Sequence, residues 1–482
     1  MNRKESFVRN SWKHNPIRSH HNTCQDLFQK AESGETLWIR LEEILNMDEM
    51  DNPNSNIEEE KTIEVSIITQ SIMDYDQRMF SNMMEYTDFY NREENYYYRP
   101  YFLSFLINVN EVKDNSRFMD FLRNEENLHQ WFRAGFSSFH SDYEVLKFPG
   151  WFQSTASPIV YKKKTLLVED KYLSPHVVEE INTLYDLGNN YCSTDKRIEN
   201  MLATQFPSGY FHEARIYSVG NGNCVYLHGK NGNKKTRLLF DIGFHVGATP
   251  PRQLKVNKRN KVISAIRNFR PDCIVLSHWD SDHYIGCAYA SYRIFNCTWV
   301  APDCYDASPN ARRLAKYLKI KKKLLVVTRG NSRLIADLQG NNAYFKLWMG
   351  SKVPNIKEDK GITKANKEGL VIEVKNDIIH TLMMGDVPYR SLPVQLNFTQ
   401  KNPFDYLIVP HHGAYMNFNL LRQNLCVNSN LALICAKRGQ NRPHQEHNAA
   451  LTQSGYTVIL TDEANFRIDL DLTRQYNFVK RH

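Results

Sequence analysis

The chain has 482 residues, of which 41% are hydrophobic and 24% charged, which is ordinary usage for a soluble globular protein. Such a length exceeds one compact core and predicts two or three domains. The net charge of +8 is mild, and no apolar run approaches the roughly 18 residues that a bilayer-spanning helix needs. Because the polar N-terminus also lacks a signal peptide, a cytoplasmic protein with no membrane contact is expected.

The first part of the chain is expected to be mainly helical. Apolar residues recur at helical intervals in 35–47 and 116–136, which predicts a mainly helical N-terminal region over residues 1–140. Residues 141–210 are then a connecting or accessory segment. Between the two helical segments, residues 51–61 are polar and form a predicted loop or linker.

An aromatic stretch and two basic segments each have two interpretations. Tyr and Phe crowd residues 86–105, where they either stack nucleotide bases or, more commonly, form a core or a domain interface. Basic residues gather in Arg252–Arg270 and Arg312–Lys323, which either attract a polyanionic substrate or are solvated helix faces. The nine cysteines form no CxxC pair and are expected to be free thiols.

From Phe211 onward, short apolar runs alternate with turn residues and helical segments. Many strands with helices between them predict an α/β layered domain over residues 211–482. A basic helix is expected at 256–269. The predicted strands are 214–219, 223–229, 235–243, 272–277, 298–302, 323–330, 369–376, 378–386, 405–413, 431–439 and 456–462.

Four polar clusters share one placement, because each directly follows a predicted strand. They are Asp241, the segment 278–283, Asp386 and the pair His411-His412. Strand ends at one edge of a sheet bring distant residues together, and ligand sites collect there. Four such clusters rich in Asp and His are hard to explain without a metal ion.

The segment HWDSDH (278–283) has informative spacing. His278 and Asp280 are two residues apart and point the same way from an extended loop. Asp282 and His283 are adjacent, so they address opposite sides or two neighbouring ions. The segment therefore predicts two cations a few ångströms apart.

This motif set resembles the metallo-β-lactamase-fold hydrolase superfamily. HWDSDH is similar to its second motif, Asp241 to its first, and Asp386 to the later residue that bridges two metals. Asp280, which stands where the commoner motif has His, and DYLIVPHHGA (405–414) are most similar to the hydrolase domain of the competence protein ComEC. The resemblance covers residues 211–472 and implies an αββα sandwich in the C-terminal half, without the ComEC membrane channel.

The resemblance also implies a set of site residues. Asp282, Asp241 and His412 are expected to act in catalysis, with Asp282 orienting a metal-bound water and Asp241 holding the metal loop in place. Asp280 makes the site more oxygen-rich, so Mn²⁺ rivals Zn²⁺ as the expected pair of divalent ions. The expected metal ligands are His278, Asp280, Asp282, His283, Asp386, His411 and His444.

Some positions depart from the family pattern. The acidic positions of its opening turn are Ser218 and Asn223 here, which are expected to shape the fold rather than bind metal. The third-motif His of the wider fold has no match before Asp386, because His380 lies mid-strand. His411 is expected to fill that vacancy.

The closing Asn-Arg-x-x-His stretch of the ComEC branch is matched loosely by residues 441–444. It is one residue shorter before its His than in the family pattern. His444 is therefore a weaker candidate ligand than His411, and His447 is an alternative.

Three functions are compatible with these features. The leading prediction is a metal-dependent phosphodiesterase, in particular a nuclease, because two metals suit in-line attack on a phosphodiester. The second keeps the hydrolase but changes the substrate to a small ester, lactone or thioester, since one scaffold hosts many reactions. The third is an effector subunit of a multicomponent, defence-type system, whose N-terminal region binds a partner protein.

Overall fold

The computed structural model describes most of the chain. The predicted loop at 51–61, residues 86–99 of the aromatic stretch and Asn441 lie outside the described residues. The described residues are 26–27, 29–31, 33–45, 62–85, 100–108, 121, 127, 129–136, 139, 141, 143–154, 160–188, 191–244, 256–353, 362–377, 379–396, 404–422, 430–436, 442–473 and 479–482.

The chain divides into two compact units. The first contains the described residues up to 186 together with residues 308–322. The second contains the described residues between 187 and 307 and those from 323 to the end. The chain therefore contributes to the N-terminal unit twice, the second time with a single helix.

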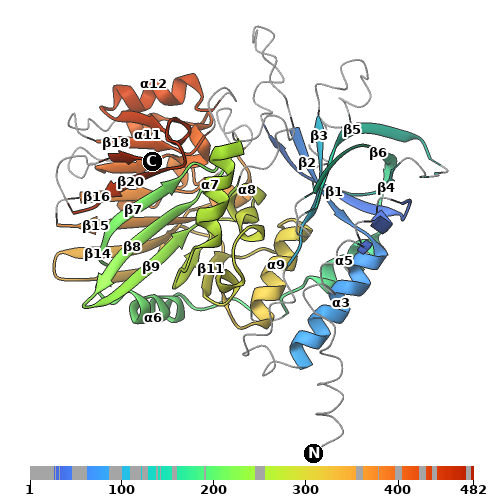
Figure 1. Cartoon of the computed structure of the whole chain (residues 1–482), viewed down its shortest axis with the longest axis horizontal. Coiled ribbons are helices and arrows are strands. Elements are labelled where there is room, and N and C mark those ends of the chain that lie inside the picture. Colours follow the sequence, from blue (N-terminus) through green and yellow to red (C-terminus); the bar gives the residue numbers. More distant parts are fainter. Residues whose placement is uncertain are drawn as a thin grey trace, which may run out of the picture. The chain divides into compact units, whose positions relative to one another are not determined.

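The N-terminal unit is built on a closed β-barrel with strand order β1-β2-β3-β5-β6-β4 (Figure 1). Every described pair of neighbouring strands is antiparallel. Closure removes the open edges that an isolated sheet would expose. The strands are β1 (Leu37–Leu45), β2 (Thr62–Ile68), β3 (Leu103–Asn108), β4 (Trp131–Gly135), β5 (Val145–Ser154) and β6 (Val160–Tyr172).

The expectation of a mainly helical N-terminal region is wrong. Residues 35–47 contain strand β1, in which Leu37, Ile39 and Leu41 are buried at the period of two that a strand imposes. So short a run of Leu and Ile fits helical spacing almost as well, and pairing with β2 and β4 decides its state. Residues 116–136 likewise contain β4 in their described part.

The longest described helices of the N-terminal unit are α3 (Gln70–Glu85), α5 (Pro175–Leu184) and α9 (Pro309–Ile320). α9 is held by Arg313, whose side chain is fully buried and donates from Nε to Asp76 of α3 at 2.8 Å. Arg312 is also buried and donates to Asn182 of α5. Both interpretations of this basic segment, a substrate-attracting surface or a solvated helix face, are wrong for these two arginines, because both side chains are buried and bonded inside the unit.

The second unit contains two sheets. One has eight described strands in the order β12-β11-β10-β9-β8-β7-β20-β21, and the other has seven in the order β13 to β19. The first sheet consists of β7 (Phe211–Tyr217), β8 (Val225–Asn231), β9 (Lys234–Phe240), β10 (Cys273–Val275), β11 (Thr298–Pro302), β12 (Leu324–Val327), β20 (Arg467–Asp471) and β21 (Val479–Arg481). The second consists of β13 (Arg333–Gln339), β14 (Ala343–Met349), β15 (Leu370–Asn376), β16 (Ile379–Met383), β17 (Tyr406–Ile408), β18 (Leu431–Ile434) and β19 (Thr457–Leu460).

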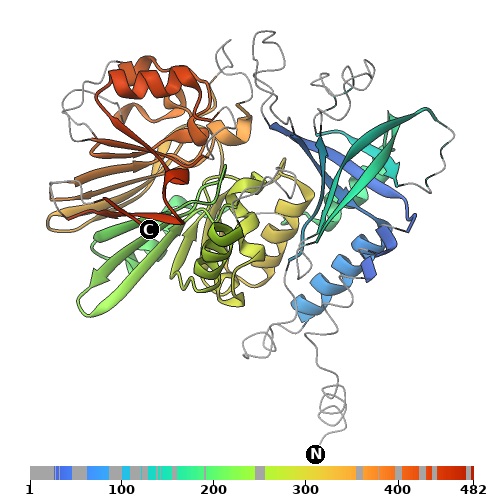
Figure 2. The same cartoon turned by 45° about the horizontal axis from the view of Figure 1, so that its top comes forward.

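The two sheets pack against each other through one apolar core, and Figure 2 shows them as separate green and orange layers. Phe240 of the first sheet and Ile372 of the second are both fully buried in this core. Val371, the neighbour of Ile372, faces the opposite side and packs with residues of α11 and α12. Each fully buried Ile or Phe of this kind stabilises the fold by about 1.5–3 kcal/mol.

Helices flank the sheets of the second unit, so the mixed α/β character expected of residues 211–482 is confirmed. In the described part of the chain, no helix is both long and apolar enough to cross a membrane. The helices are α6 (Asp195–Gln205), α7 (Val256–Arg267), α8 (Ser281–Tyr284), α10 (Lys364–Lys367), α11 (Asn419–Arg422) and α12 (Gln445–Gln453).

Candidate metal centre

The polar clusters expected at strand ends do converge. Asp241 follows β9, and the segment 278–283 follows β10, which is parallel to β9 in the first sheet. Asp386 follows β16, and the pair His411-His412 follows the parallel strand β17 of the second sheet. Loops from the carboxyl ends of both sheets thus bring their side chains to one place.

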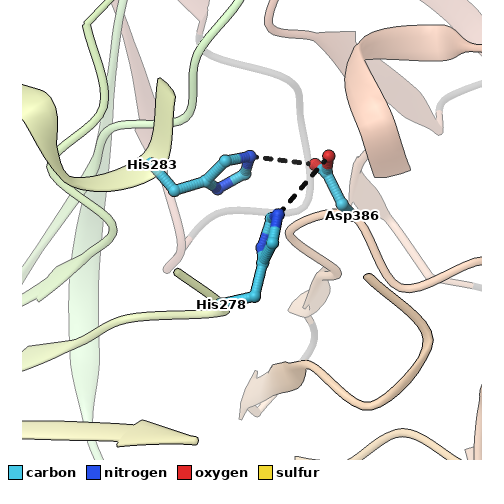
Figure 3. Close-up of side chains that lie close together, drawn as sticks. All are labelled: His278, His283 and Asp386. Carbon is cyan, nitrogen blue, oxygen red and sulfur yellow. Dashed lines mark ion pairs between the residues drawn. The ribbon is translucent and has the colours of Figure 1, made fainter. Parts of the chain in front are cut away.

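Asp386 lies at the middle of this cluster, and its two carboxylate oxygens face different groups. Oδ1 lies 3.1 Å from Nε2 of His283 and 3.7 Å from Nε2 of His412. Oδ2 lies 3.8 Å from Nε2 of His278 and contacts Nδ1 of His411. Figure 3 shows the His278 and His283 rings approaching this carboxylate from two directions.

The two carboxylates of HWDSDH contact different histidines. Asp282 lies 3.0 Å from Nε2 of His412 and 3.8 Å from Nε2 of His283. Asp280 lies 3.0 Å from Nε2 of His278. Two groups have ligand atoms within 4.8 Å of one another and could each hold an ion. They are His278, His283 and Asp386, and Asp282, His283 and His412.

Three buried atoms of the cluster lack a hydrogen-bond partner within the described part of the chain. They are Nε2 of His283, Nε2 of His412 and Oδ1 of Asp386. A buried polar atom without a hydrogen-bond partner lowers the stability of the fold by about 1–3 kcal/mol, so such atoms indicate a site for a bound ligand. Their mutual spacing of 3.1–3.7 Å is that of donor atoms around one cation. The residues present therefore fit a divalent metal ion.

The opposite nitrogen of each imidazole, Nδ1, has its own partner, and Nε2 is the atom that faces the carboxylates. Nδ1 of His283 donates to Asp241 at 2.8 Å, and Nδ1 of His412 donates to the Cys435 carbonyl at 2.9 Å. Nδ1 of His278 lies 3.0 Å from the hydroxyl of Ser277. Contacts of this kind set the tautomer and ring orientation of metal-binding histidines.

Asp241 is fully buried and organises this support rather than facing the other ligand atoms. It accepts hydrogen bonds from the backbone N–H of Ser277 at 2.6 Å, from the Ser277 hydroxyl at 2.8 Å and from the Asn223 amide at 3.1 Å. With His283 it therefore anchors the start of the HWDSDH loop. Asn223, expected to shape the fold, does so by bonding Asp241.

Electrostatics favours positive charge at the centre. Burial would raise the pKa of Asp386, but the neighbouring histidines, His283 foremost, hold the pKa of this carboxyl well below its usual range. Burial likewise opposes ionisation of Asp282, and His283 and His412 nevertheless lower its pKa to about 2. Burial would lower the pKa of His283, yet the surrounding carboxylates raise it well above its usual value. Ionised carboxylates around a stabilised positive charge are the environment that a divalent cation requires.

The backbone of the centre is unusual at several ligand positions. Asp241, His411 and His412 have φ values of 55°, 49° and 54°, in the left-handed region that side chains other than Gly seldom adopt. Gly385, before Asp386, also has a positive φ, and a Cβ there would lie 2.4 Å from the side chain of Ser277. Strain concentrated at one cluster is typical of functional sites.

Three other histidines lie apart from these groups of ligand atoms. His444, an expected ligand, begins helix α12 and accepts a hydrogen bond from the Glu446 backbone. Both ring nitrogens of His447 are already bonded, to the Ala414 carbonyl at 2.7 Å and to the Tyr389 hydroxyl at 2.9 Å. Burial lowers the pKa of His447 to about 3, which keeps the ring neutral. His380 pairs with Glu373 at 2.8 Å.

One residue of the centre has no counterpart in the sequence prediction. Asn366 of α10 is fully buried, and its amide nitrogen lies 3.1 Å from both Nε2 of His278 and Oδ2 of Asp280. It lies in the interval where a third-motif His was sought. A search for imidazoles alone could not find it.

No family model and no curated protein matches the chain. A Parabacteroides distasonis protein described as a proposed metal-dependent hydrolase is 12% identical, with 52% of this chain and 99% of that chain covered and a TM-score of 0.30. A variant of the CmlA β-hydroxylase is 14% identical, covering 77% of this chain and 76% of that chain at a TM-score of 0.31. CmlA, a diiron β-hydroxylase from Streptomyces venezuelae, is 13% identical, covering 83% and 82% at 0.31.

Proposed function

We propose that this chain is a metal-dependent hydrolase of the metallo-β-lactamase fold, related to the ComEC branch, that cleaves phosphodiesters and in particular nucleic acid. The observation that carries the proposal is the placement of Asp386, whose two oxygens face separate groups of buried ligand atoms. A carboxylate placed in this way is suited to bridge two cations. Two cations suit in-line displacement because one can stabilise the attacking oxygen and the other the leaving oxygen.

Two ions, Zn²⁺ or Mn²⁺, would fit among these ligand atoms. Asp282, His283 and His412 would hold the first ion, and His278 and Asp280 the second, with Asp386 shared between them. When bound, the ions would lower the pKa of a coordinated water and neutralise charge on the substrate. His411 remains a proposed ligand through its contact with Asp386.

The side chains of the centre would position the attacking water and the metal-binding loop. Asp282 is largely buried beside His283 and His412, so one of its oxygens can orient the attacking water while the other binds metal. His412 is held by the Cys435 carbonyl with Nε2 directed at the same place. Asp241 would keep the HWDSDH loop in register.

Two cationic side chains of the second unit lie next to site residues and support an anionic substrate. Arg442 donates a hydrogen bond to the backbone carbonyl of His411. Lys364 belongs to the same short helix as Asn366 and is partly exposed. A phosphodiester, unlike a neutral ester or lactone, would pair with such charges.

A cleavage panel tests the proposal. Protein freed of metal with a chelator is reloaded with Zn²⁺ or Mn²⁺ and incubated with DNA, RNA and a nitrophenyl phosphodiester. Asp282→Ala and His283→Ala should abolish cleavage, whereas His176→Ala, which alters an exposed histidine of α5, should not. If none of the three substrates is cut but an ester, lactone or thioester is, the small-molecule hydrolase replaces this proposal.

The partner-protein function is a separate proposal. In the described part of the chain, all the grouped ligand atoms belong to the second unit, which leaves the barrel available for a partner or for substrate. Purification of the full chain from native cells tests this. A chain that elutes alone and fully active argues against an obligate partner.

A further inference from the structure

The two groups of ligand atoms around Asp386 differ in whether their lone pairs are already used. The three atoms without a hydrogen-bond partner all belong to the group of His283, His412 and Oδ1 of Asp386. When the ligand atoms are instead divided by the oxygen of Asp386 that they face, a second group consists of His278, Asp280 and Oδ2 of Asp386, and its members have a partner in common. That partner is Asn366.

The amide nitrogen of Asn366 reaches every member of the second group. It lies 3.1 Å from Nε2 of His278, 3.1 Å from Oδ2 of Asp280 and 3.5 Å from Oδ2 of Asp386. All three are acceptors, and they are the atoms that the proposed second ion would use. The amide thus donates hydrogen to the same lone pairs that a cation would take.

Hydrogen bonds to the side-chain oxygen of Asn366 set the orientation of its amide group. Oδ1 of Asn366 accepts hydrogen bonds from the backbone N–H and the hydroxyl of Thr363, both at 2.7 Å. The bond from the Thr363 N–H belongs to the capping box at the start of α10, whose other bond runs from the Asn366 N–H to the Thr363 hydroxyl oxygen, and a backbone N–H can only donate. The oxygen is therefore held away from the centre, and the NH₂ group faces it. An NH₂ group cannot ligate a metal.

We propose that Asn366 makes the two metal positions unequal. The position of Asp282, His283 and His412 binds an ion tightly, because Nε2 of His283 and Nε2 of His412 make no hydrogen bond within the described part of the chain. The position of His278 and Asp280 binds weakly, because an ion there must first displace the Asn366 amide from both ligand atoms. This inference rests on the proposed metal centre and concerns how it is loaded.

The test is a calorimetric metal titration, since it needs no enzymatic activity. Metal-free protein is titrated with Zn²⁺, and metal content after dialysis is measured by mass spectrometry. The wild-type chain should bind one ion tightly and a second on the order of tenfold more weakly, by analogy with the loss caused by altering ligand support. One ion per chain should survive dialysis.

Two substitutions remove the competing amide. Asn366→Asp keeps the oxygen that caps α10 and replaces NH₂ by a ligand, so the second step should tighten on the order of tenfold. Asn366→Ala should tighten it by less and without added charge. The first step should be unchanged in both. Asn268→Ala, at an exposed asparagine near the end of α7, is the matched control and should change neither step.

The outcomes are distinguishable. Two equal steps in the wild-type chain, or a second step that Asn366→Asp leaves unchanged, would overturn the inference while leaving the proposed hydrolase intact. A chain that binds no metal at all would overturn both. Circular dichroism of each variant confirms folding, and Asn366→Asp should fold even if Asn366→Ala does not.

Discussion

The two units of this chain each bury a cluster of charged side chains, and only one cluster is saturated with hydrogen bonds. In the barrel unit, Asp76 accepts from Arg313, Tyr101 and Tyr185 at 2.8, 3.1 and 2.5 Å. Arg313 in turn donates to Asn310, to the Tyr185 hydroxyl and to the Tyr101 carbonyl. Donors and acceptors there are matched without any ligand.

In the second unit, the cluster around Asp386 is equally buried but has an excess of acceptors. His283, His412 and Asp386 each retain a buried atom that lacks a hydrogen-bond partner among the described residues. A cluster whose polar atoms are all hydrogen-bonded stabilises the fold by itself, whereas a cluster with unpaired acceptor atoms can bind a cation. Hydrogen-bond satisfaction therefore distinguishes these two buried clusters, whereas burial and charge do not.

The largest effect is expected at Asp386. Asp386→Asn keeps the size of the side chain but removes the charge that both groups of ligand atoms share. Metal binding should be lost, and hydrolysis should fall on the order of a thousandfold, about 4 kcal/mol of transition-state stabilisation. Metal analysis and the cleavage assay measure this. Asp74→Asn, at an exposed carboxylate, is the control, and retained metal in Asp386→Asn would disprove the shared role.

Substitutions in the Asp76–Arg313 cluster should change the stability of the chain but not its metal binding. Arg313→Leu leaves Asp76 buried without its partner, which should lower the free energy of unfolding by about 3–5 kcal/mol. Urea unfolding followed by circular dichroism measures the loss, and the double variant Asp76→Leu/Arg313→Leu should recover part of it. Metal content should not change. If metal is lost together with stability, the two clusters are not independent.

Removing the hydroxyl that contacts the metal-binding imidazoles should have a smaller effect. The Ser277 hydroxyl donates to Asp241 and lies 3.0 and 3.1 Å from Nδ1 of His278 and His283. Ser277→Ala should weaken metal binding on the order of 10- to 100-fold while the chain remains folded. Calorimetry measures the change against Ser264→Ala, an exposed serine. Equal affinities would show that the hydroxyl does not orient the rings.

The smallest effect concerns His447, whose bonds are saturated like those of the barrel cluster. Its pKa of about 3 in the folded chain lies below the ordinary 6.5, so the folded state favours the neutral ring. This stability is fully present above pH 6.5 and is lost as the pH falls towards 3, by up to about 1.4 kcal/mol per pH unit. His447→Gln should flatten the decline between pH 7 and 5 in metal-free protein. Parallel unfolding curves for the two proteins would contradict the assignment.

Sequence patterns predicted the second unit better than the first. The apolar runs at 272–277 and 378–386 contain strands β10 and β16, because buried parallel strands are continuous apolar segments. Strands β13 and β14 were not predicted, although AYFKLWM places apolar residues at a period of two on the core side, because RLIADLQ is irregular and both segments contain charged residues. In the barrel, β1 was mistaken for a helix because nine residues cannot separate the two periods.

Local composition alone determined where chemistry is concentrated, because Asp and His directly after apolar strands must lie at the carboxyl edge of a sheet. That reasoning reached HWDSDH, Asp386 and His412 without a structure. Only the tertiary structure decided which oxygen of Asp386 faces which histidine, that His444 caps a helix, and that Arg313 is internal. Only it revealed the amide of Asn366 beside His278. Apart from the local His444 cap, these outcomes depend on contacts between residues tens to hundreds of positions apart, which periodicity and spacing cannot reveal.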